Sequence, residues 1–137
     1  MIQAEAKLKR KLLEAFQDLT GGKHAKDAIG LWINAAALSR AGFPDQLFVA
    51  DGGEAWVESK VNGNPMTDSQ KLQCPRLARA GRRVFLLECP DMSLDKKDRQ
   101  LLLQQFDARG DLGTIKVFSW PMMKERYFWG IVLGVDL

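Results

Sequence analysis

Gly42-Phe43-Pro44-Asp45 opens the stretch of sequence that decides the fold, and Val57-Glu58-Ser59-Lys60 lies near its end. Between them come the apolar run Gln46–Ala50 and the turn Asp51-Gly52-Gly53, after which a second extended run covers Glu54–Val61. Glycines that adopt a positive φ favour a tight connection between two antiparallel strands. We therefore expect a β-hairpin at this point of the chain.

The hairpin carries charges at positions that suggest chemistry. Asp45 stands at the start of the first strand, and Glu58 and Lys60 are two residues apart on the second, so they share a face. Val57 and Val61 point the other way, into a core, which leaves the charged pair facing a cleft or solvent. Two carboxylates suit Mg²⁺, and a neighbouring lysine can hold or deprotonate a water molecule. The pattern predicts metal-dependent hydrolysis of phosphodiesters; an Asx turn at Asp45 and a plain surface ion pair are the alternatives.

Length and composition limit the other classes of protein. The chain of 137 residues suits one domain, and a net charge of +3 is compatible with a nucleic-acid partner without requiring one. Cys74 and Cys89 lack the spacing of a zinc site or a disulfide framework, and His24 is the only histidine. Neither a signal peptide nor a run of transmembrane length is present, so we expect no membrane partner and a cytoplasmic location.

An amphipathic helix is expected over Gln3–Leu19, before Gly21-Gly22. Its apolar positions recur at helical spacing: Leu8, Leu12, Leu13, Phe16 and Leu19. At about 100° per residue, Glu5 points along this apolar face and Glu14 points away from it. A carboxylate on the packed face is costly unless it is paired or metal-bound, although an acid in the first turn can also stay hydrated beside the helix dipole.

The middle of the chain predicts further elements. Leu31-Trp32-Ile33 is typical of a strand, whereas Asn34–Arg40 is either helical or irregular. Thr67 and Gln70 form a capping-box pattern that opens a helix to about Ala80. A buried strand, Val84–Leu87, follows Gly81.

For the C-terminal part we expect a helix over Leu94–Phe106. Ile115–Trp120 and Tyr127–Val135 are expected to form a terminal hairpin or a pair of edge strands. The order of helices and strands predicts an α/β domain with a mixed central sheet.

The order of these residues resembles the PD-(D/E)xK nuclease superfamily. The string Gly42-Phe43-Pro44-Asp45, Val57-Glu58-Ser59-Lys60, Thr67-x-x-Gln70 and Gly81 is most similar to the virus-type replication-repair (VRR-NUC) branch and to phage Holliday-junction-resolvase-like nucleases. The likeness covers residues 41–88 and the helix before them. Residues 91–137 are a C-terminal extension that the likeness does not place, within a single nuclease-like domain of residues 1–137.

The resemblance implies a restriction-endonuclease-like fold and a set of site residues. Asp45, Glu58, Lys60 and Gln70 would be catalytic, and the ligands of Mg²⁺, which Mn²⁺ can replace, would be Asp45, Glu58, Glu5 and the Ser59 main-chain carbonyl. Lys60 would position the attacking water or neutralise charge on the phosphate, and Gln70 would orient the water or the metal shell. The products would carry a 5′-phosphate and a 3′-hydroxyl.

The partner implied is DNA, branched or structured, in phage or bacterial DNA processing inside the bacterial host. Candidate phosphate contacts are the basic residues near the motif: Lys23, Lys26, Arg40, Arg76, Arg79, Arg82 and Arg83. Homodimerisation, or docking to a larger phage or replication assembly, would use the apolar segment Ile115–Val135 with Trp120, Phe128 and Trp129.

A different class of protein is the alternative: a catalytically silent nuclease fold that serves as a structural or DNA-binding module. Such a module would have little reason to keep Asp45, Glu58, Lys60 and Gln70 together. An RNA-directed nuclease ranks lower, because no aromatic-rich RNA platform motif is visible.

Overall fold

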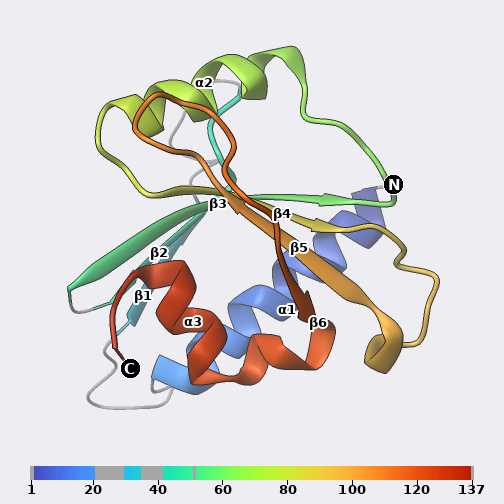
Figure 1. The fold of residues 1–137 in the computed structure, drawn as a ribbon. Coiled ribbons are helices and arrows are strands. Elements are labelled where there is room, and N and C mark those ends of the chain that lie inside the picture. Colours follow the sequence, from blue (N-terminus) through green and yellow to red (C-terminus); the bar gives the residue numbers. More distant parts are fainter. Residues whose placement is uncertain (1, 21–29, 35–41, 51, 137) are drawn as a thin grey trace.

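A computed structural model describes residues 2–20, 30–34, 42–50 and 52–136 of the chain. The part that it describes is an α/β domain built on one mixed sheet (Figure 1). Its elements in chain order are α1 (Ile2–Thr20), β1 (Gly30–Asn34), β2 (Gln46–Ala50), β3 (Gly53–Val61), α2 (Asp68–Arg79), β4 (Val84–Cys89), the 3₁₀ turn η2 (Lys96–Asp98), β5 (Gln100–Gln105), β6 (Lys116–Ser119), the 3₁₀ turn η3 (Trp120–Lys124) and α3 (Arg126–Leu133).

The strands of the described sheet follow one another in chain order, β1-β2-β3-β4-β5-β6. Each neighbouring pair is antiparallel except β3 and β4, which are parallel. A parallel pair needs a crossover connection, and α2 supplies it. This confirms the mixed central sheet and the hairpin formed by β2 and β3.

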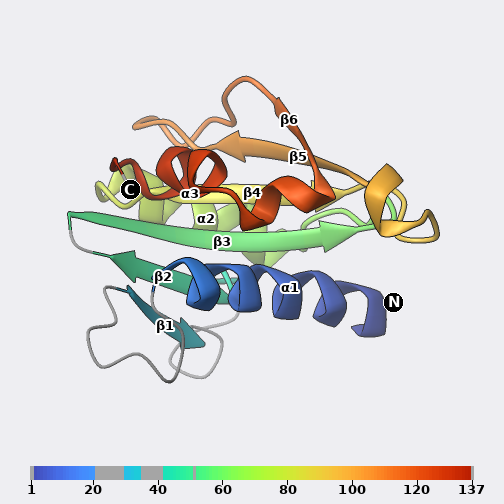
Figure 2. The same cartoon turned by 90° about the horizontal axis from the view of Figure 1, so that it is seen from below.

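Helices cover both faces of the sheet. α1 and α3 pack on one face, and α2 packs on the other (Figures 1 and 2). The larger core lies under α1 and α3, where Phe16, Phe48 and Trp129 meet with ring centroids 4.9–5.1 Å apart. A smaller core under α2 contains Cys74, Ala78 and Phe106. Because both faces are covered, β3 and β4 are buried along most of their length.

The expected helices and strands of the first two thirds are confirmed where the structure describes them. α1 and β1 lie where the sequence places them, and residues 35–40, expected to be helical or irregular, are outside the described residues. The capping box is also present: Gln70 N donates to Thr67 Oγ1 at 3.1 Å, and Thr67 N donates to Gln70 Oε1 at 2.8 Å. These features depend on short-range patterns, which explains why the sequence alone predicts them.

Two predictions for the C-terminal part are wrong. The segment expected to be a helix over Leu94–Phe106 contains η2 and the strand β5, whose burial alternates because Leu101 and Leu103 face the core. The segment Tyr127–Val135, expected to be a strand, is mostly the helix α3. Its buried residues are at helical spacing, and Gly134, with φ of 74°, ends it. The expected strand over Ile115–Trp120 is confirmed as β6, at the edge of the sheet.

The C-terminal segment is therefore part of the central fold. β5 and β6 extend the sheet, and α3 helps to close its larger core. Trp120, Phe128 and Trp129, expected on a dimer or docking surface, are buried with at most 4% of their surface exposed. No helix among the described residues combines the length and the apolar character needed to cross a membrane.

Candidate active site

The candidate site lies where β3 continues beyond the start of β2. Pairing between the two strands begins at Gln46 and Val57, so residues 58–61 of β3 have β4 on one side and no β2 residue on the other. Asp45 immediately precedes β2, and continuing the antiparallel register places it beside Glu58. The hairpin register thus brings together two carboxylates that are 13 positions apart in the printed sequence.

Glu58 and Lys60 point toward the α2 side of the sheet, because they alternate with Val57 and Val61 in the core under α1 and α3. Glu58 is fully buried, and Lys60 is only 8% exposed. The expectation of an open cleft or solvent around this pair is therefore wrong. Side chains from α1 and α2 cover both charges, since β2 leaves this side of β3 free.

The two oxygens of the Glu58 carboxylate have different surroundings. Oε2 accepts a hydrogen bond of 3.0 Å from Gln70 Nε2 and lies 3.6 Å from Lys60 Nζ. Oε1 is buried and has no hydrogen-bond partner among the residues that the structure describes. Burial, and secondly the charge of Asp45, raise the pKa of Glu58 to about 7. A buried carboxylate with one unpaired oxygen is costly, so this atom is suited to receive a ligand.

The N-terminal part of α1 lies beside the end of β3 (Figure 2). It contributes a second pair of charges to the site. Lys9 Nζ donates a hydrogen bond to Asp45 Oδ2 and lies 3.1 Å from Glu5 Oε2. The other oxygen of Glu5, Oε1, is 4.0 Å from Lys60 Nζ. Glu5 therefore faces the sheet as expected, and Glu14 is exposed on the far side of the helix.

We call these side chains the polar cluster: Glu5, Lys9, Asp45, Glu58, Lys60 and Gln70. It draws on α1, the loop before β2, β3 and α2, and its carboxylates and ammonium groups alternate in space. Lys9 is not among the site residues predicted from the sequence. Its spacing from Glu5 could have indicated it, because residues four apart on a helix lie on the same side and pair when their charges are opposite.

Ser59 does not contribute its side chain to the polar cluster. It alternates with Glu58 and Lys60, so its hydroxyl group points to the other face of the sheet, where Oγ is buried without a partner. The ligand atom predicted from the sequence is the main-chain carbonyl oxygen of Ser59. Because the hydroxyl group points away, this oxygen is the one atom of Ser59 that could bind a metal ion in the polar cluster.

The structure describes some of the basic residues expected to contact DNA. Lys23, Lys26 and Arg40 lie outside the described residues. Arg76 and Arg79 are exposed in the last turn of α2, six and nine positions after Gln70, which is about 9 and 14 Å along the helix. At about 100° per residue, Arg79 lies on the opposite side of α2 from Gln70, and its guanidinium group lies beside Gly110.

Arg82 and Arg83 have protein partners instead. Arg82 pairs with Glu54 at 3.0 Å. Arg83 Nη2 donates to the main-chain oxygens of Ile131 and Val132, each at 3.1 Å, near the C-terminal end of α3. These contacts compete with the expected contact between Arg83 and phosphate, because they hold α3 against the rest of the fold.

The polar cluster fits a hard divalent cation in its chemistry. Asp45 and Glu58 supply carboxylate oxygens of the kind Mg²⁺ prefers, and Glu58 Oε1 is unpaired. Within the part of the chain that the structure describes, however, no three acidic, histidine or cysteine side chains form a ready metal-ligating group. Lys9 and Lys60 are interposed among the carboxylates, so a cation that binds Asp45 Oδ2 competes with Lys9.

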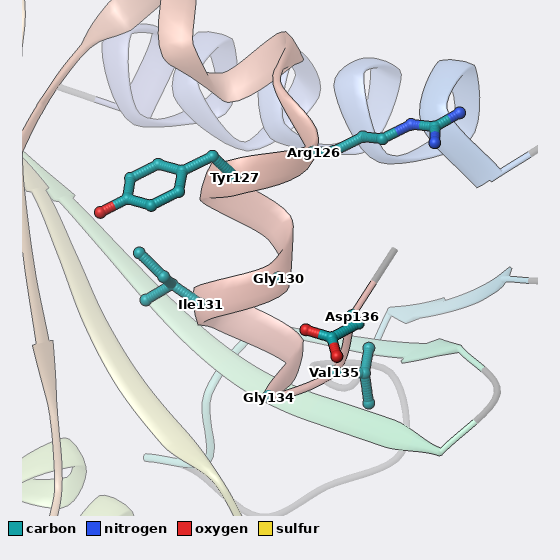
Figure 3. A pocket seen from close by; sticks show the side chains of 7 residues that line it. All are labelled: Arg126, Tyr127, Gly130, Ile131, Gly134, Val135 and Asp136. Carbon is teal, nitrogen blue, oxygen red and sulfur yellow. The ribbon is translucent and has the colours of Figure 1, made fainter.

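Two hollows of the described surface are lined by other residues. One, of about 570 Å³, follows the outer side of α3 from Arg126 to Asp136, where Tyr127 and Ile131 project beside Gly130 (Figure 3). The other, of about 540 Å³, lies between the end of α2 and β5 and includes Arg82 and Phe106. No member of the polar cluster lines either hollow, so neither contains the candidate chemistry.

Comparisons with known proteins add no relative: no family model, curated protein or solved structure matches the chain.

Proposed function

We propose that the protein is a metal-dependent endodeoxyribonuclease of the PD-(D/E)xK type with a restriction-endonuclease-like fold. One observation carries the proposal. Asp45, Glu58, Lys60 and Gln70, from a loop, a strand and a helix, meet where β3 continues beyond the start of β2. Glu58 is buried there with a free oxygen, which a purely structural ion pair does not explain.

The residues support a division of roles. Asp45 and Glu58 Oε1, with Glu5 and the Ser59 carbonyl, would hold Mg²⁺ or Mn²⁺. When bound, such an ion polarises the phosphate and lowers the pKa of a coordinated water. Lys60 keeps its ammonium group 3.6 Å from Glu58 Oε2, where it can orient the attacking water or offset charge on the phosphate. Gln70 fixes the Glu58 carboxylate by its hydrogen bond to Oε2.

The proposed substrate is DNA, branched or structured, in phage or bacterial DNA processing. Arg76, exposed in the last turn of α2, is a candidate contact to a second phosphate of such a ligand. A homodimer would supply two such sites for two strands. The aromatic residues of the C-terminal part are buried and do not support a dimer surface there. The proposal of a homodimer therefore rests only on the proposed class of substrate.

The test is cleavage of labelled four-way junction, flap, single-stranded and linear duplex DNA with Mg²⁺, Mn²⁺ or EDTA. Lys60→Ala should abolish cleavage and leave DNA and metal binding mostly intact. Lys60→Met keeps the length of the buried side chain, and circular dichroism checks that both variants fold. Lys116→Ala removes an exposed lysine of β6 and serves as the matched control, with cleavage unchanged.

Metal-dependent cleavage that both Lys60 variants lose supports the proposal, and the preferred DNA names the class. Intact DNA in every lane, from folded protein, refutes it and favours the alternative of a silent nuclease fold that binds DNA or serves a structural role. Appreciable turnover by Lys60→Ala would refute the role assigned to Lys60.

A further inference from the structure

Lys9 occupies a position in the polar cluster that the proposed roles do not use. Its ammonium group bonds Asp45 Oδ2 and lies 3.1 Å from Glu5 Oε2, so it contacts two of the carboxylates assigned to the metal. Lys9 is therefore a cation held at the carboxylates that a metal ion would need.

The main chain beneath Lys9 is fixed, whereas the end of its side chain is not enclosed. Gln46 Nε2 donates to the Lys9 main-chain oxygen at 3.1 Å, which ties this turn of α1 to the start of β2. Leu8 and Leu12 anchor the helix in the core. The Lys9 side chain nevertheless keeps 24% of its surface exposed, so the ammonium group can leave Asp45 without moving the helix.

Lys60 has a different set of partners. It lies near Glu5 and Glu58, at 4.0 and 3.6 Å, and its side chain is only 10% exposed. Its charge remains in the cluster when Lys9 moves. Of the two lysines, Lys9 is the one bonded to Asp45 and the one with access to solvent, so Lys9 is the charge that a cation must displace.

We propose that Lys9 is an internal counter-ion that competes with the divalent metal for Asp45 and, once displaced, binds a phosphate of the DNA. This role presupposes the nuclease function proposed above. Metal binding releases the ammonium group for the phosphate, and a bound phosphate draws it away from Asp45. The two ligands therefore strengthen each other's binding, and the coupling is the same in either direction.

Removing the charge at Lys9 should tighten metal binding in the absence of DNA. A partly exposed ion pair changes a binding constant by up to about fivefold, which sets the expected gain for Lys9→Met. The same variant should also lose part of the increase in DNA affinity that metal produces in the wild type. Lys9→Arg keeps the positive charge and should restore the weaker metal binding.

The experiment titrates Mn²⁺ into DNA-free protein and follows binding by calorimetry for the wild type, Lys9→Met and Lys9→Arg. Lys7→Met is the matched control, because Lys7 is exposed on the same helix. A second titration measures the fluorescence anisotropy of a labelled four-way junction with Ca²⁺ and with EDTA. Gel analysis of the recovered DNA confirms that it stays intact.

Tighter Mn²⁺ binding by Lys9→Met alone, with a smaller effect of Ca²⁺ on its DNA affinity, supports the proposal. Equal Mn²⁺ affinity for the wild type and Lys9→Met overturns it, and the nuclease function still stands if the wild type cleaves DNA. Tighter binding by Lys9→Met in a protein that never cleaves DNA supports the counter-ion and refutes the nuclease. Absence of Mn²⁺ binding from both proteins overturns both.

Discussion

Gln70 links the first turn of α2 to the carboxylate of Glu58. Its Nε2 donates to Glu58 Oε2 at 3.0 Å, while its Oε1 accepts from Thr67 N at 2.8 Å. One side chain thus completes a capping box and orients a buried acid of the candidate site. The sequence predicts both a capping role and a site role for Gln70. The two roles are compatible, because the side-chain oxygen and nitrogen of Gln70 have different partners.

The two roles of Gln70 can be separated by mutation. Gln70→Ala and Thr67→Ala each remove part of the capping box and should lower the free energy of unfolding by about 1 kcal/mol. Only Gln70→Ala also frees Glu58 Oε2, so we expect its cleavage rate to fall by about 10- to 100-fold. Thermal unfolding and cleavage assays measure the two effects. Equal cleavage rates in the two variants would show that Gln70 acts on the helix alone.

Glu58 should make the stability of the metal-free protein depend on pH. Its pKa, about 7 in the folded state against 4.5, means that the folded protein holds the proton more tightly. Stability is then full below about pH 4.5 and is lost as the pH rises through 7, by up to about 3 kcal/mol. Glu58→Gln cannot ionise and should remove this dependence.

Urea unfolding in EDTA from pH 4.5 to 8 measures this effect. Glu54→Gln is the matched control, because Glu54 lies on the same strand and the same face but is partly exposed and paired with Arg82. It should follow the wild-type profile. A Glu58→Gln profile parallel to that of the wild type would mean that Glu58 titrates in its ordinary range.

Gly42 should be needed for the position of Asp45. Its φ is +93°, and an added Cβ would lie 2.3 Å from the main-chain oxygen of Ser69, in the first turn of α2. Gly42→Ala therefore forces the loop away from α2, at about 2–4 kcal/mol of stability, and should also reduce cleavage by the protein that remains folded.

Gly63→Ala is the control for that substitution. Gly63 also has a positive φ, +75°, but no atom lies within 4 Å of an added Cβ. We expect a loss of about 1 kcal/mol from backbone strain, with cleavage unchanged. Similar stability and activity in the two variants, measured by thermal unfolding and cleavage, would contradict the close packing of the loop against α2.

Arg83 and Arg82 should differ in their effect on stability. Arg83→Met leaves two main-chain oxygens of α3 without their donor and should cost about 1.5–3 kcal/mol. Arg82→Met removes an exposed ion pair and should cost at most about 1 kcal/mol. Urea unfolding measures both, and DNA anisotropy should show no weaker binding by Arg83→Met. A selective loss of DNA affinity in that variant would restore Arg83 as a phosphate contact.

The errors in the C-terminal part have a physical cause. Leucine and glutamine in β5 favour a helix by intrinsic propensity, but β4 and β6 pair with this segment on both sides and impose a two-residue alternation. Aromatic and β-branched residues in α3 favour a strand, yet Phe128, Trp129 and Val132 are buried together only at helical spacing. Tertiary contacts overrode local preference in both segments.

The sequence by itself determined the features that depend on neighbouring residues. The periodicity of α1, the glycine turn between β2 and β3 and the capping box of α2 are short-range, and so is the placing of Glu58 and Lys60 on one face of a strand. Tertiary structure alone decided the fate of the C-terminal segment, the full burial of Glu58 and the pairing of Lys9 with Asp45. These depend on how distant elements pack, because burial and ion pairing are set by neighbours in space.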